Sequence, residues 1–85
     1  MKQQDFNDNK YTWNDLVKIN EDAPSSFHPG EVGVICGMGK IEYQELADKY
    51  LSRIGSWMYT VEFSDGSDIV VTEEYLETYS ENSPK

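Results

Sequence analysis

Residues 57–72 read Trp57-Met58-Tyr59-Thr60-Val61-Glu62-Phe63-Ser64-Asp65-Gly66-Ser67-Asp68-Ile69-Val70-Val71-Thr72, and they carry the strongest structural signal in the chain. Large apolar residues occupy every second position from 57 to 63, which is the pattern of a strand with one buried face. Asp65-Gly66 is a strong hairpin-turn signal, and residues 68–72 supply a β-branched return strand. The stretch therefore predicts an antiparallel hairpin.

A short strand and a long loop are expected near the N-terminus. In residues 15–19, Val17 and Ile19 fall on one face and Lys18 on the other, as in a half-buried strand. Residues 20–30 contain two prolines and a glycine, which cannot sustain a strand ladder. We expect Phe27, within this loop, to fold back over the core.

Residues 31–38 form the second predicted strand. Its glycines mark a sharp bend or a close approach of backbones, as a small barrel requires where a strand curls. Cys36 lies on an apolar face of this strand, so it is expected to be a small core residue and not a nucleophile. That face contains Val32, Val34, Cys36 and Met38.

The periodicity changes between residues 40 and 54. Apolar side chains recur there at helical spacing, which predicts an amphipathic helix over about residues 41–54 that ends at Gly55. The apolar stripe contains Tyr43, Leu46, Ala47, Tyr50, Leu51 and Ile54. The side chains expected to face inward are Tyr43, Leu46, Tyr50 and Leu51.

The remaining elements follow the hairpin. Residues 72–76 predict a single helical turn with Thr72 as its cap, and residues 77–79 predict a short last strand. We expect a single domain over residues 11–80, between a flexible arm at residues 1–10 and a flexible tail at residues 81–85.

This order of elements resembles the SH3-like barrel from Leu16 to Tyr79. The layout is similar to two groups of short bacterial proteins, namely stand-alone SH3-like proteins of unknown function and proposed immunity proteins of toxin–immunity loci. The resemblance implies a mainly β fold, a barrel of about five antiparallel strands, and a protein partner. It is carried by Val17-Lys18-Ile19, Pro29-Gly30-Glu31-Val32-Gly33-Val34-Ile35, Tyr59-Thr60-Val61-Glu62-Phe63-Ser64-Asp65-Gly66 and Glu74-Tyr75-Leu76-Glu77. The helical block departs from the usual pattern because it is longer than the loop normally found there, and we expect it to cover an open end or edge of the barrel.

The composition indicates a small cytoplasmic protein. A chain of 85 residues supports one modest core. Its single cysteine excludes an internal disulfide and fits a reducing compartment. The N-terminus lacks a signal-peptide pattern, and no run approaches the ~20 apolar residues that span a membrane.

Groups that could carry catalysis are sparse. His28 is the only histidine, and one histidine with one cysteine cannot supply the roughly four ligands of a zinc site. Asp65 and Asp68 flank a turn that is too short for a calcium loop. We therefore expect a protein that is not an enzyme and that has no metal or cofactor.

Charge is the most informative property for function. Sixteen acidic residues oppose seven basic ones, which gives a formal net charge of -9. Such a surface repels nucleic acid and anionic membranes and favours a basic protein partner. The expected binding residues are Glu62, Asp65, Asp68, Glu73, Glu74 and Glu77, together with an exposed Trp13. Glu62 is out of phase with its apolar neighbours and should face solvent. The alternative is a solvated acidic face without a binding role.

Aromatic residues outnumber the places in such a small core. Tyr11 and Trp13 precede the first strand and are expected to be the exposed ones, although packing against the outside of the barrel is equally compatible with their position.

Three functions fit these observations. The first is an immunity or antitoxin-like inhibitor that binds a cognate bacterial toxin, because toxins that attack nucleic acid tend to be basic. The second is a general protein–protein adaptor. The third is an acidic mimic of nucleic acid that occupies the groove of a DNA- or RNA-binding enzyme.

Overall fold

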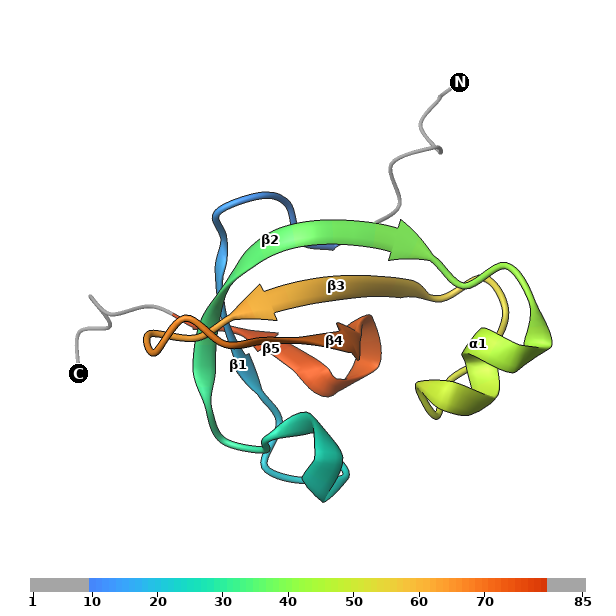
Figure 1. The fold of residues 1–85 in the computed structure, drawn as a ribbon, viewed down its shortest axis with the longest axis horizontal. Helices are drawn as coiled ribbons and strands as arrows, with labels where there is room; N and C mark the ends of the chain where they lie inside the picture. The colour runs from blue at the N-terminus through green and yellow to red at the C-terminus, as the bar shows by residue number, and fades with distance from the viewer. Residues whose placement is uncertain (1–9, 80–85) are drawn as a thin grey trace.

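The computed structural model describes residues 10–79, and the expected tail and nearly all of the expected arm lie outside the described residues. Five strands form one antiparallel sheet in the order β4-β3-β2-β1-β5 (Figure 1). The strands are β1 (Leu16–Ile19), β2 (Val32–Lys40), β3 (Trp57–Glu62), β4 (Asp68–Thr72) and β5 (Leu76–Thr78). The helical elements are η2 (Ser25–Phe27), α1 (Gln44–Lys49) and η3 (Glu73–Tyr75). The mainly β class is confirmed. Within residues 10–79, no ladder joins the edge strands β4 and β5, so the sheet is not closed.

The predicted hairpin is formed by β3 and β4. Val61 pairs with Ile69 and Tyr59 with Val71, and Tyr59, Val61 and Val71 have no exposed surface. Gly66 has a φ of 91°, which a residue without a Cβ adopts at little cost. The carboxylate of Asp65 accepts hydrogen bonds from the backbone and hydroxyl of Ser67. The hairpin predicted from alternation and the Asp65-Gly66 turn is therefore confirmed.

The core face of β2 differs from the prediction for Cys36. Gly33 and Ile35 face the core, and Ile35 is fully buried, whereas Cys36 is half-buried and is not a core residue. The register with β3 shifts between Ile35 and Gly37, which places Cys36 at a bulge. A bulge adds one residue to one strand and changes which side chains point inward beyond it. Met38 consequently pairs with Tyr59 and packs against the core.

Gly33 explains why β2 can bend so strongly. A Cβ at this position would lie 2.5 Å from Cγ1 of Val61 and 2.7 Å from the backbone oxygen of Glu62. The backbones of β2 and β3 therefore approach more closely than any side chain at position 33 would permit. Figure 1 shows β2 curving from its pairing with β1 to its pairing with β3.

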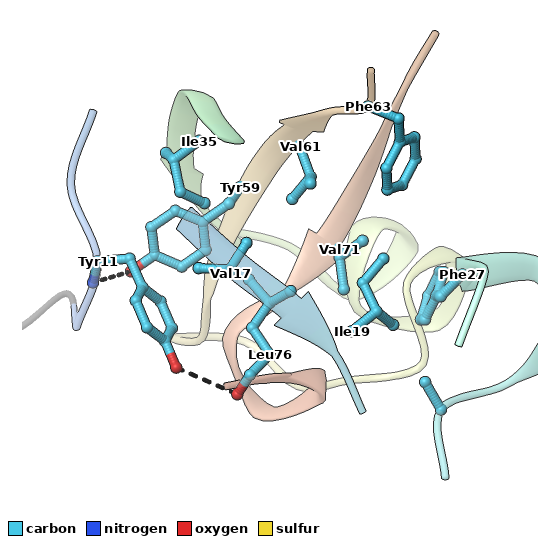
Figure 2. Close-up of a cluster of buried hydrophobic side chains, with 11 residues drawn as sticks. Tyr11, Val17, Ile19, Phe27, Ile35, Tyr59, Val61, Phe63, Val71 and Leu76 are labelled. Carbon is cyan, nitrogen blue, oxygen red and sulfur yellow. Dashed lines mark hydrogen bonds between the residues drawn. The ribbon is translucent and has the colours of Figure 1, made fainter. Parts of the chain in front are cut away.

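The core is built from the inward faces of all five strands and from the preceding loops. Phe27 is buried against it, as expected, with its ring centroid 5.3 Å from that of Tyr75. Tyr11 is also buried, with only 4% of its surface exposed, so the expectation of an exposed Tyr11 is wrong. Figure 2 shows the reason: the Tyr11 N–H donates to the Tyr59 hydroxyl and the Tyr11 hydroxyl donates to the carbonyl of Leu76.

The helix is much shorter than predicted. Only Gln44–Lys49 are α-helical, and Tyr43 and Leu51, expected inside, are exposed by 56% and 51%. Leu51 takes a left-handed conformation with φ of 55°, and the Ser52 N–H bonds to the Ala47 carbonyl. This is a Schellman-type ending, and it stops the helix well before Gly55.

The expected cap at Thr72 is wrong, whereas the expected inward packing of Tyr50 is found in part. Thr72 makes no side-chain capping bond to η3, and its hydroxyl is buried without a hydrogen-bond partner. The interior of the α1 segment is filled by Ile41 and Ala47, while Tyr50 packs partly against the core.

Candidate functional site

The strand pairing places apolar and acidic residues in one row on the outer face of the sheet. Leu16 of β1 is opposite Val34 of β2, and Val34 is opposite Glu62 of β3. Glu62 is in turn opposite Asp68 of β4. Directly opposed residues point to the same face of a sheet. The buried neighbours of these residues point inward, so the row lies on the side away from the core.

A hollow of about 340 Å³ lies at the apolar half of this row. We call it the outer-face hollow; its lining residues are Leu16, Val32, Gly33, Val34, Glu62, Phe63 and Ser64. The valines and Leu16 are half-buried, so they keep apolar surface available to a partner. Protein-binding sites usually have an apolar centre surrounded by a polar rim.

One carboxylate, that of Glu62, lines the hollow, and others lie on the strands beside it. Glu62 and Asp68 are exposed at its β3–β4 side, and both raise the pKa of the Cys36 thiol, although burial of the thiol is the larger cause. On the other side Glu77 of β5 is opposite Lys18 of β1. Lys18 forms a salt bridge with Glu21 at 3.0 Å, which raises the lysine pKa. The border of the hollow is therefore mainly acidic.

Asp65 is at the tip of the same hairpin. Hydrogen bonds from Ser67 hold its pKa below the usual range, and the nearby His28 acts in the same direction. His28 stacks on Phe63, with parallel rings whose centroids are 5.4 Å apart. Since Phe63 lines the hollow, Asp65 and His28 lie close to it. We define the acidic rim as Glu62, Asp65, Asp68 and Glu77.

Glu73 and Glu74 are separate from this rim. They follow β4 at the end opposite the hairpin turn, and they line another hollow of about 400 Å³ beside Arg53 and Trp57. The Glu73 carboxylate accepts hydrogen bonds from the Tyr59 hydroxyl and the Lys10 N–H, at 2.7 and 2.6 Å. The Glu74 carboxylate accepts a bond of 2.6 Å from the Ser52 hydroxyl. Both carboxylates thus accept hydrogen bonds that connect separate segments of the fold.

Trp13 is 57% exposed, as expected, in a turn whose next residue, Asn14, donates from its N–H to the carbonyl of Ile35. It does not line the outer-face hollow. Of the seven expected binding residues, only Glu62 lines this hollow, and Asp68 is opposite Glu62 in the hairpin. Asp65 is on the hairpin turn, Glu77 is on β5, and Glu73, Glu74 and Trp13 lie elsewhere.

The apolar centre of the site was missed by sequence reasoning. Leu16, Val32 and Val34 looked like ordinary strand residues, and only their pairing shows that they share one exposed face. The available signal was the alternation itself, because Val17 and Ile35 cannot face the core unless Leu16 and Val34 face away from it.

Residues 10–79 hold no group of three or more His, Cys, Asp or Glu side chains arranged for a metal ion. No helix in the same part of the chain is long and apolar enough to cross a membrane. Comparison with protein families, characterised proteins and solved structures finds no match.

Proposed function

We propose that this chain is a cytoplasmic SH3-like barrel protein, without enzymatic activity, that neutralises a basic bacterial toxin by binding it at the outer-face hollow. The observation that carries the proposal is the row from Leu16 through Val34 to Glu62 and Asp68. It joins an apolar contact surface to carboxylates that attract a cationic protein.

The strand order supports the SH3-like assignment. A tight hairpin of the third and fourth strands, followed by a single helical turn before the fifth, is the arrangement that the sequence resemblance implies. The bend at Gly33 lets β2 pair with β1 at one end and with β3 at the other, which brings two parts of the sheet around one core.

The two parts of the site have different roles in binding. Exposed carboxylates accelerate the encounter with a basic partner and lose this effect as salt rises. Apolar contacts in the hollow mainly slow dissociation, because most affinity within one interface is set by the off-rate. The lowered pKa of Asp65 keeps this carboxylate charged well below neutral pH.

The direct test measures binding to the proposed toxin, which should be encoded by the gene next to this one in the native genome. Reversal of Glu62 and Asp68 to Lys should lower the association rate roughly tenfold or more, and Val34→Ser should mainly raise the dissociation rate. The control reverses Glu42 and Glu45 to Lys, two exposed carboxylates of the α1 segment that change the net charge equally. Equal effects of both reversals would refute the hollow as the site, and absence of any binding to that toxin would refute the inhibitor function in favour of an adaptor.

A further inference from the structure

The face of the sheet that carries Glu62 and Asp68 continues along both strands of the hairpin. Side chains on one face of a strand recur at every second residue. Thr60 and Met58 therefore share the face of Glu62 along β3. Val70 shares the face of Asp68 along β4, and it is directly opposite Thr60. The strand register thus joins these side chains and the two carboxylates in one continuous surface.

The neighbouring part of β2 contributes no side chains to this surface. Gly37 is opposite Thr60, and Gly39 is opposite Met58. A Cβ at Gly37 would lie 3.1 Å from the hydroxyl oxygen of Thr60, and one at Gly39 would lie 3.6 Å from Cε of Met58. The side chains of Thr60 and Met58 therefore lie on the side of the sheet that the two glycines leave open.

A hollow of about 170 Å³ lies at this part of the surface. We call it the Met58 hollow; its lining residues are Met38, Gly39, Tyr50, Met58, Tyr59, Thr60 and Val70. No charged residue is among them. Since an apolar cavity of about 150 Å³ holds one benzene molecule, the Met58 hollow has room for one aromatic ring. Its two methionines suit such a ring, because thioether sulfur makes favourable contacts with aromatic side chains.

Tyr50 supplies the one wall of the Met58 hollow that does not belong to the sheet. The two residues that follow it are fixed by hydrogen bonds. The Tyr75 hydroxyl donates a 2.8 Å bond to the Leu51 carbonyl. The Ser52 hydroxyl donates a 2.6 Å bond to the Glu74 carboxylate. The wall is therefore formed before a partner arrives, which reduces the ordering cost of binding.

The charges next to the Met58 hollow differ between its two sides. Glu62 and Asp68 follow Thr60 and Val70 toward the hairpin turn, so their carboxylates border one side. On the side of Tyr50 lies a cation, because Nζ of Lys49 is 5.5 Å from the centroid of the Tyr50 ring. A basic partner is therefore attracted at the hairpin side and repelled at the Tyr50 side.

The other charged groups near the ends of these strands face away from the Met58 hollow or line another one. Lys40 is opposite Trp57, on the other face from Gly39, and its Nζ lies 5.3 Å from the centroid of the Trp57 ring. Glu73 and Glu74 line the separate hollow of about 400 Å³ together with Arg53.

We propose that the Met58 hollow receives one aromatic side chain of a basic protein whose cations face Glu62 and Asp68. Met58 and Glu62 are four residues apart on β3, which corresponds to about 13 Å. An extended partner segment spans this distance when a lysine or arginine precedes or follows the aromatic residue by up to four positions. The inference rests on the proposed function for the identity of the partner, since the hollow continues the same outer face.

NMR spectroscopy of the full chain, with ¹³C-labelled methionine methyl groups, tests the proposal without the toxin. The probe is the peptide Lys-Ser-Lys-Ser-Phe with blocked termini, and the reference peptide has serine in place of phenylalanine. The aromatic peptide should shift the Met58 methyl signal and bind at least about fivefold more tightly than the reference, because its ring is buried in the hollow. Equal affinities of the two peptides, or an unshifted Met58 signal, would overturn the proposal.

Thr60→Lys fills the Met58 hollow with a charged side chain and should abolish the preference for the aromatic peptide. The matched control is Thr12→Lys, which adds the same charge at an exposed threonine outside the hollow and should keep the preference. Val70→Ser removes apolar lining without adding bulk and should reduce the preference, which guards against misfolding of the first variant. A preference that survives in both Thr60→Lys and Val70→Ser would contradict the assignment of the hollow.

The peptide and toxin experiments fail independently. If the toxin binds while the two peptides bind equally, the inference about the Met58 hollow is wrong and the inhibitor function stands. If the aromatic peptide is preferred while the toxin does not bind, the inhibitor function is wrong and the hollow is a site for an aromatic side chain of another basic protein.

Discussion

The hydroxyl of Tyr59, on a side chain with no exposed surface, donates a 2.7 Å hydrogen bond to the carboxylate of Glu73. The same hydroxyl accepts a bond from the Tyr11 N–H, while the same carboxylate oxygen accepts one from the Lys10 N–H. These bonds connect the centre of the core to η3 and to the segment before β1. The segment at residues 10–11 is therefore part of the folded domain.

Replacing Tyr59 by Phe should destabilise the fold by about 1–3 kcal/mol, because a buried N–H and a carboxylate each lose a partner. Urea unfolding at pH 7 measures the change. The control is Tyr75→Phe, which removes a hydroxyl bond at an exposed site and should cost less. If both variants lost the same free energy of unfolding, the hydrogen bonds of the Tyr59 hydroxyl would contribute no more to stability than the exposed bond of Tyr75.

Stability should fall at alkaline pH. Burial raises the pKa of both Tyr59 and Tyr11 above the ordinary value of 10.0. A pKa raised by folding gives stability that is fully present below about pH 10 and is lost as the pH rises further, by up to about 1.4 kcal/mol per pH unit for each group. Urea unfolding at pH 8 and pH 11 checks this, and Tyr59→Phe should show a smaller difference between the two pH values. An unfolding free energy that is constant over this range would contradict the burial of both hydroxyls.

Alanine at Gly33 should destabilise the protein by about 1–3 kcal/mol or more, because its Cβ would overlap Val61 and the backbone of Glu62. Gly39→Ala is the matched control in the same strand, where the nearest atom, Cε of Met58, would lie 3.6 Å from the new Cβ. Thermal unfolding of both variants distinguishes the two sites. If Gly33→Ala were as stable as Gly39→Ala, β2 and β3 would not approach as described.

The Cys36 thiol should react more slowly with a disulfide reagent at pH 8 than a free cysteine does. Burial, Glu62 and Asp68 raise its pKa and reduce the thiolate fraction. Glu62→Gln combined with Asp68→Asn should accelerate the reaction, whereas Glu42→Gln combined with Glu45→Gln should leave it unchanged. A rate that is insensitive to the first pair would place Cys36 away from the acidic rim.

The β3–β4 hairpin and α1 differ in how well the local sequence pattern predicts their structure. The hairpin depends on alternation and on the Asp65-Gly66 turn, both of which act between residues close in sequence. The helical periodicity of residues 43–54 was equally regular, yet the helix ends at Lys49. The Tyr75 hydroxyl donates to the Leu51 carbonyl, and the Ser52 hydroxyl donates to the Glu74 carboxylate. These partners lie 24 and 22 residues away, and their bonds hold Leu51 and Ser52 in the non-helical path.

For this protein, the sequence by itself determined the strands, the hairpin, the buried Phe27 and the acidic character, because alternation, turn chemistry and charge are properties of short segments. Tertiary structure alone decided the burial of Tyr11, the bulge at Cys36, the division of the carboxylates into two groups, and the exposure of Leu51. Each of these features depends on which residues of a neighbouring strand or loop come to lie next to the residue concerned. That choice is made by the packing of one shared core, and no single segment of the chain contains it.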